Sequence, residues 1–122
     1  MQSSKRSLEV FILVFLLLIM TNTALAKDVW FYTDKAAYGI DHYYLISESI
    51  ETQGHNAWGC KVKHIHNERL IATNLYIFFQ DSEKGGISVS QWLDGQYSYI
   101  GPVTSSTCYV RLWKSMQPYI NR

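Results

Sequence analysis

The chain has 122 residues, with 11 Lys and Arg against 10 Asp and Glu, and a formal net charge of +1. A chain of this length builds one modest hydrophobic core, which excludes multidomain enzymes, doubly wound nucleotide-binding folds and solenoid repeats. A nearly neutral protein has no electrostatic basis for binding nucleic acid or an anionic membrane, so neither is an expected partner.

The N-terminus has the three parts of a secretory signal. The Lys5-Arg6 pair gives a positive start, residues 10–20 are uninterruptedly apolar, and Ala24-Leu25-Ala26 supplies small residues at a cleavage site. The apolar run is too short for a membrane span, which needs about 20 apolar residues. We therefore expect a secretory signal peptide at 1–26 and a single globular exported domain at 27–122, secreted or periplasmic, with no membrane span after cleavage.

Cys60 and Cys108 are the only cysteines, and both lie in the exported part. An oxidising compartment permits a disulfide, which on the chain-entropy model would stabilise a closed loop of about 48 residues by about 4 kcal/mol. The alternative is two buried free thiols, because cysteine also serves as a small core residue. We expect a Cys60–Cys108 disulfide, and no redox-active dithiol because there is no Cys-x-x-Cys pair.

An alternation of apolar and polar residues with a period of two runs through most of the remaining chain. It predicts strands at 29–33, 43–51, 57–65, 70–80, 87–92 and 97–100. In the third of these, the face with Trp58, Cys60 and Val62 is apolar and the opposite face carries lysines, as in a sheet with one wet side. Residues 70–80 are apolar on both faces, which predicts a central strand covered on both sides. Turns are predicted at the polar, glycine-containing segments 34–39, 81–86 and 94–95.

The C-terminal segment has a different pattern. After Gly101-Pro102, apolar residues recur with helical spacing. Pro118 would end such a helix, and its start can be capped by Ser105, Ser106 or Thr107. The competing interpretation is a last strand over 108–113, and we favour the helix. The expected fold class is therefore α+β, an antiparallel sheet of five or six strands with one C-terminal helix packed on it.

Few residues have the spacing that catalysis or metal binding requires. His64 and His66 leave the same face of a strand, but they supply two ligands where a metal site needs three or four. Asp41 does not orient His42, because adjacent residues of a strand face opposite ways. Glu48 falls on an apolar face, with no second carboxylate placed opposite it as glycosidase chemistry needs. We expect no catalysis, metal or cofactor; the alternative is a small hydrolase or metal-binding protein centred on His64, His66 and Glu48.

Aromatic residues are frequent, since the chain has 4 Trp and 9 Tyr. Tyr and Trp suit interfaces because they bury a large area at small rotamer cost and keep a polar tip. Trp92, Tyr97 and Tyr99 cluster around one turn, and we expect them to form a binding surface. The alternative is that these rings cover the core of a small β domain. The expected function is that of a non-catalytic exported domain binding a protein or envelope component through exposed aromatics.

Short segments spread over residues 28–117 match one family pattern: Val29-Trp30-Phe31-Tyr32, Ser49-Ile50, Trp58 before Val62-Lys63, and Ile100-x-Pro102. In these segments the chain resembles small exported bacterial domains of the surface-adhesin protein E type. The resemblance implies a mixed sheet-and-helix domain at the cell envelope, where some members bind host matrix or plasma proteins. The aspartate usual before the Ser-Ile pair is replaced near Ile46, and no ligand-contacting residue is matched, so adhesion is implied by analogy.

Overall fold

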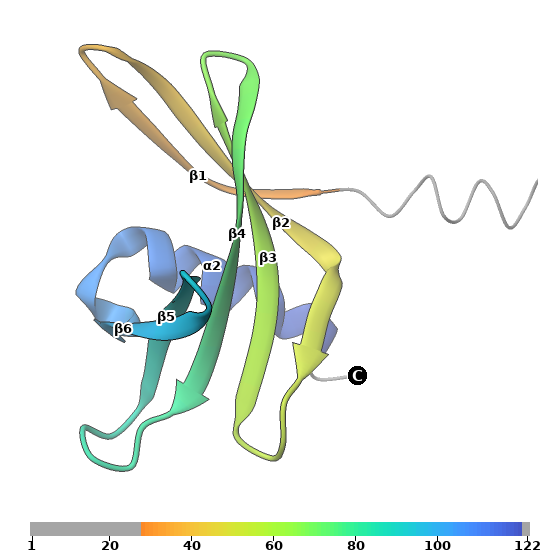
Figure 1. Ribbon diagram of the computed structural model, residues 1–122, viewed down its shortest axis with the longest axis vertical. Coiled ribbons are helices and arrows are strands. Elements are labelled where there is room, and N and C mark those ends of the chain that lie inside the picture. Colours follow the sequence, from red (N-terminus) through yellow and green to blue (C-terminus); the bar gives the residue numbers. More distant parts are fainter. Residues whose placement is uncertain (1–27, 121–122) are drawn as a thin grey trace, which may run out of the picture.

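The computed structural model describes residues 28–120, so the secretory signal expected at 1–26 lies outside the described residues. Six strands form one antiparallel sheet in which each strand pairs with its neighbour in sequence (Figure 1). The strands are β1 (Val29–Ala36), β2 (Gly39–Thr52), β3 (Ala57–His66), β4 (Arg69–Gln80), β5 (Ile87–Leu93) and β6 (Gln96–Pro102). A short 3-10 helix, η1 (Val103–Ser105), leads into the helix α2 (Thr107–Ile120). The predicted α+β fold class is confirmed.

Tight turns join consecutive strands and fix their register. Asn67 and Glu68 link β3 to β4 with φ angles of 46° and 69°, and Asp94 and Gly95 link β5 to β6 with φ angles of 51° and 86°. Two successive positive φ angles define the type I′ turn, whose twist matches that of the flanking strands. The turn at Asp94-Gly95 is thus confirmed. The turn expected over 34–39 is too long, because β1 and β2 stay paired as far as Ala36 and Gly39.

The predicted turn at 81–86 is confirmed, and Asp81 holds it together. The Oδ1 atom of Asp81 accepts hydrogen bonds from the backbone amides of Glu83 at 3.0 Å and Lys84 at 3.1 Å. Its Oδ2 atom accepts a hydrogen bond from the Ser88 hydroxyl at 2.8 Å. These bonds, the one from Ser88 foremost, lower the pKa of the Asp81 carboxyl group. The carboxylate therefore stabilises the turn, since it accepts hydrogen bonds from two backbone amides of the turn.

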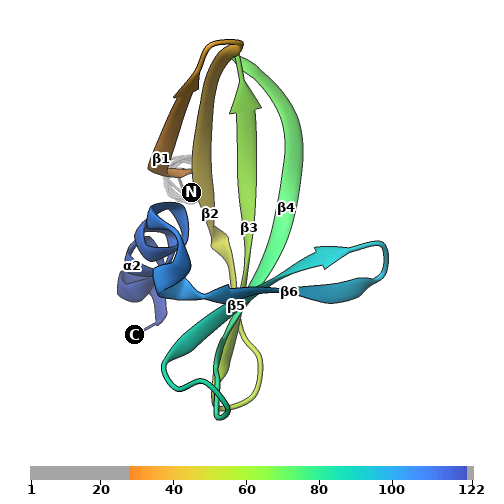
Figure 2. The same ribbon diagram turned by 90° about the vertical axis from the view of Figure 1, so that its left-hand side faces the viewer.

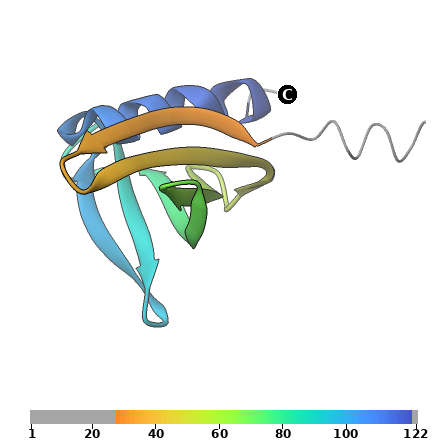
Figure 3. The ribbon, with the colours of Figure 1, turned by 90° about the horizontal axis from the view of Figure 1, so that it is seen from above.

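The helix α2 lies across one face of the sheet, alongside β1 and β2 (Figures 2 and 3). Trp113 packs against Trp58 and Phe78, with ring centroids 5.4 Å and 5.3 Å away. The buried core between helix and sheet consists of Phe31, Leu45, Cys60, Val62, Tyr76, Phe78, Val89, Val103, Leu112 and Met116. The helix therefore covers the face of β3 that its apolar alternation indicated.

The helix begins and ends close to the predicted positions. The Ser106 hydroxyl accepts a hydrogen bond from the backbone amide of Cys108 at 3.3 Å, which caps the first turn. Pro118 lies inside the helix, which continues to Ile120, so the expectation that Pro118 ends it was wrong. A proline in the last turn removes a single backbone hydrogen bond there, a smaller loss than in a helix interior.

The prediction that residues 70–80 form a strand covered on both sides was wrong. In β4, Tyr76 and Phe78 are buried beneath α2, but Leu70 and Ile71 are 58% and 55% exposed. Among residues 28–120, the one α-helix packs on one face of the single sheet, so the opposite face has no second layer. We call the face of the sheet opposite α2 the outer face.

Cys60 and Cys108 are both free thiols in the structure, so the expected disulfide is absent. Cys60 is fully buried in β3, whereas Cys108 lies in the first turn of α2, where it lines a pocket with Tyr43 and Val62. The helix residue that packs on the Trp58 end of β3 is Trp113, farther along α2. The structure therefore has the alternative arrangement, two free thiols in or beside the core. Packing, with no covalent bridge between these cysteines, holds the helix on the sheet.

Both thiols should react with iodoacetamide far more slowly in the folded protein than in the unfolded chain. Burial raises the pKa of the Cys60 thiol to about 12 and that of the Cys108 thiol to about 11. At pH 8 a thiol with a pKa of about 11 is ionised in roughly one molecule in a thousand, and the thiolate is the reactive species. Mass spectrometry should find two adducts per chain after labelling in urea without a reductant. An unlabelled chain under those conditions would indicate a disulfide.

Candidate functional site

The three aromatic residues predicted to form a binding surface come together on the outer face. Trp92 pairs with Tyr97 across the β5–β6 hairpin, and Ser90 pairs with Tyr99. Directly opposite residues of an antiparallel pair point to the same side, so all three rings share one face. Val89 points the other way into the core, which places these rings on the side away from α2. We call Trp92, Tyr97 and Tyr99 the aromatic surface.

The rings of the aromatic surface are accessible. Trp92, Tyr97 and Tyr99 are 43%, 39% and 46% exposed, and none of them belongs to the residues packed against the core. Trp92 and Tyr97 meet edge to face, with centroids 4.9 Å apart, and the Lys84 ammonium lies 4.9 Å from the centre of the Tyr99 ring. The alternative that these rings cover the core is therefore not what the structure shows.

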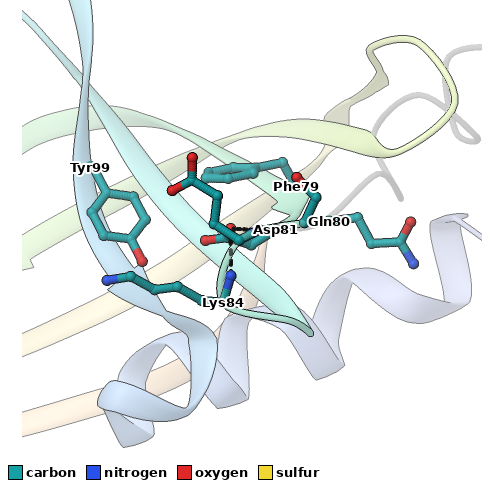
Figure 4. Close-up of a pocket in the computed structure, with 7 residues that line it drawn as sticks. Phe79, Gln80, Asp81, Lys84 and Tyr99 are labelled. Carbon is teal, nitrogen blue, oxygen red and sulfur yellow. Dashed lines mark hydrogen bonds between the residues drawn. The ribbon is translucent and has the colours of Figure 1, made fainter.

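An open pocket of about 530 Å³ adjoins the aromatic surface at the β4–β5 turn (Figure 4). Tyr99 forms one side of it and Phe79 another, with ring centroids 6.4 Å apart, while Gln80 points away from both (Figure 4). The other lining residues belong to the turn that Asp81 organises. The pocket thus extends the aromatic surface toward a turn that carries both acidic and basic side chains.

A second cluster lies on the opposite side of the sheet, the side that α2 covers. The Oδ1 atom of Asp41 lies 2.8 Å from Nε2 of His64 and 2.8 Å from Nδ1 of His66. Asp41 is only 8% exposed and stands opposite His66 in the β2–β3 register. The approach of Asp41 to the two histidines was not predicted, because in the sequence Asp41 is adjacent only to His42. The cross-strand register is the signal that brings Asp41 to the two histidines.

Neighbouring groups fix the orientation of both imidazole rings. The backbone amide of Ile40 donates to Oδ1 of Asn67 at 3.0 Å, so the side-chain NH₂ of Asn67 faces Nε2 of His66 at 3.2 Å. Nε2 therefore accepts a hydrogen bond, and Nδ1 carries the proton that His66 donates to Asp41. The ring of His64 stacks on Tyr43 with centroids 4.5 Å apart. Hydrogen bonds from His64 and then His66 lower the pKa of Asp41.

The residues of the alternative prediction do not form one site. Glu48 is exposed and lies in the irregular part of β2 between Ile46 and Glu51, in a pocket that contains neither His64 nor His66. The structure therefore brings together two of the three predicted residues, with Asp41 where Glu48 was expected. Within the described range 28–120, no group of three or more His, Cys, Asp or Glu side chains is arranged to hold a metal ion.

Asp41 should stabilise the fold at neutral pH and lose this effect in acid. Because the pKa of Asp41 is lower in the folded protein than its ordinary value of 3.8, the folded state favours the carboxylate. That contribution is present above about pH 3.8 and disappears as the pH falls through the folded pKa. Urea unfolding from pH 7 to pH 2 should show Asp41→Asn less stable than the wild type at pH 7, with the difference vanishing in acid.

The matched control for this measurement is Asp94→Asn, which removes the same charge from the exposed β5–β6 turn. The loss of stability measured for Asp94→Asn is subtracted from the loss measured for Asp41→Asn, and the remainder is attributed to the contacts of Asp41. A difference between the wild type and Asp41→Asn that stays constant from pH 7 to pH 2 would show that the carboxylate charge has no part in holding the histidines.

Comparison with known proteins adds no relationship. No family model matches the chain, and neither a curated protein nor a solved structure matches it. Over residues 28–120, no helix has the length and apolar character needed to cross a membrane.

Proposed function

We propose that this chain is a non-catalytic exported domain that binds a protein or envelope component through its aromatic surface. One observation carries the proposal: Trp92, Tyr97 and Tyr99 share the outer face, are each 39–46% exposed, and are not among the residues that pack against the core. Exposed aromatic surface is costly to keep solvated, and burying it on a partner recovers that free energy.

The position of the aromatic surface favours contact with a large partner. The surface lies on the last hairpin, and β6 is an edge strand that pairs only with β5. The hairpin turns away from the direction of β2–β4, so its outer face stands clear of the rest of the sheet (Figure 2). Trp and Tyr anchors commonly contribute the largest shares of binding free energy, about 2 kcal/mol or more each.

Export is part of the proposal. The composition of residues 1–26 is that of a secretory signal, which supports a secreted or periplasmic location. Free cysteines are compatible with an oxidising compartment here, because burial raises the pKa of both thiols and keeps them in the unreactive protonated form. The resemblance to surface-adhesin protein E type domains supports the same interpretation by analogy.

Loss of two aromatic anchors should abolish retention of the partner. We expect the immobilised wild-type protein to retain a component of the envelope or extracellular fraction that the Trp92→Ala/Tyr97→Ala double variant does not retain. Removing two such anchors should weaken binding by at least about a hundredfold. The matched control is Trp30→Ala/Tyr38→Ala, which removes two other exposed aromatics, 51% and 78% exposed, at the opposite end of the sheet.

Retention that is equal in the double variant and its control would contradict the proposal. A hydrolytic activity or metal affinity that disappears in His64→Ala would instead favour the alternative function. Circular dichroism of each variant establishes that the fold is intact, as expected for substitutions of exposed side chains.

A further inference from the structure

A pocket of about 270 Å³ opens on the helix side of the sheet, between the first turn of α2 and strands β1, β2 and β4. It is remote from the aromatic surface, which lies on the outer face. Four of its lining residues are tyrosines, and they come from three strands and the helix: Tyr32, Tyr43, Tyr76 and Tyr109. Its volume equals that of about nine water molecules, enough for a small organic ligand.

The tyrosine rings are arranged around the pocket in two close pairs. Tyr32 and Tyr43 have centroids 6.0 Å apart, and Tyr76 and Tyr109 meet edge to face at 5.9 Å. The face of an aromatic ring is electronegative and attracts a cation held within about 6 Å of its centre. Several such rings around one space form an environment in which a desolvated cation keeps favourable electrostatic contacts without needing hydrogen-bond partners.

The charges around the pocket also favour a cation. Asp34 is the only charged residue among those that line it, and it lies at the exposed edge. Burial, followed by the negative charge of Asp41, raises the pKa of Tyr43 to about 12, and Asp34 acts on Tyr43 in the same direction.

We propose that this pocket binds a small quaternary ammonium compound, with the cationic group against the tyrosine rings and its charge directed to Asp34. A quaternary cation suits the aromatic part of this lining, because contacts with aromatic rings stabilise it without hydrogen-bond acceptors. This site is separate from the aromatic surface and does not depend on the function proposed for it.

Isosteric probes of different charge test the assignment. Calorimetric titration of the protein with choline should give binding at least about tenfold tighter than with 3,3-dimethylbutan-1-ol, in which carbon replaces the nitrogen. The anion 3,3-dimethylbutanoate should bind more weakly still. The proposal would be overturned if the neutral or the anionic compound bound as tightly as choline or more tightly. It would also be overturned if choline showed no binding at concentrations up to about 10 mM.

Two substitutions locate the binding. Asp34→Asn and Tyr109→Leu should each weaken choline binding by about threefold to tenfold, because each removes one favourable electrostatic contact. Asp94→Asn, which removes the same charge from the distant β5–β6 turn, should leave the affinity unchanged. Asp34 is an exposed side chain, so this variant should fold normally even if Tyr109→Leu does not. Unchanged affinity in Asp34→Asn would overturn the placement of the cation.

Discussion

Replacing Phe78 by alanine is expected to lower the free energy of unfolding by about 3–5 kcal/mol. Phe78 is fully buried in β4, and its ring stacks on Trp113 of α2 with centroids 5.3 Å apart and an interplanar angle of 26°. The substitution leaves a cavity at the contact that holds the helix on the sheet. Because small domains are stable by only about 5–15 kcal/mol, this loss is a large share of the total.

The neighbouring residue supplies the control for this prediction. Phe79 is of the same residue type and in the same strand, but it points to the outer face, where it is only partly buried and packs against Tyr99. Phe79→Ala should cost less than half as much, since its ring leaves no closed cavity. Urea denaturation of the two variants gives both values. Equal losses would contradict a sheet covered by the helix on one face only.

Replacing Gly39 by alanine is the second substitution expected to have a large effect, about 3 kcal/mol from backbone strain and lost hydrogen bonds together. Gly39 opens β2 with a φ of 151°, which L-residues rarely adopt. A Cβ atom there would lie 2.6 Å from Oδ1 of Asn67 and 2.6 Å from Cε1 of His66. Asn67 accepts a hydrogen bond from the Ile40 amide and contacts the ring of His66. Displacing the Asn67 side chain would therefore disturb the hydrogen bond between His66 and Asp41.

Gly54→Ala separates strain from collision. Gly54 also has a positive φ, 71°, but a Cβ there meets no atom within 4 Å. Its substitution should cost about 1–2 kcal/mol, the strain of a left-handed residue alone. The ring nitrogen shifts of His64 and His66 in NMR spectra should change in Gly39→Ala and stay the same in Gly54→Ala. Identical shifts in both variants would show that Asn67 does not hold the histidine.

The strands were predictable wherever one side of the chain faces the core and the other faces water. Residues 57–65 alternate cleanly, and they form β3 almost as expected. The coverage of β4 was not predictable, because its apolar outer residues are equally consistent with burial and with an open face. The described part of the chain has one α-helix, which can cover only one of the two sheet faces. The sequence of a single strand does not indicate which face the helix covers.

The two candidate sites differ in how far the sequence could reveal them. The Asp94-Gly95 turn fixes the pairing of Trp92 with Tyr97, so their position on a common face follows from a local signal. Asp41 and His66 are 25 residues apart in the sequence. They come together only through the register of β2 with β3. The thiol state of Cys60 and Cys108 likewise depends on where the helix carries Cys108 along the sheet, which spacing does not determine.

Site-specific photo-crosslinking tests the central claim, that the aromatic surface binds a partner, most directly. Benzoylphenylalanine would be placed at Tyr97 in one variant and at Tyr38, exposed on the distant β1–β2 hairpin, in another. Illumination of cells that export each variant should give a discrete crosslinked species from position 97 that is absent from position 38. Crosslinks from position 38 alone, or none from either position, would contradict the account.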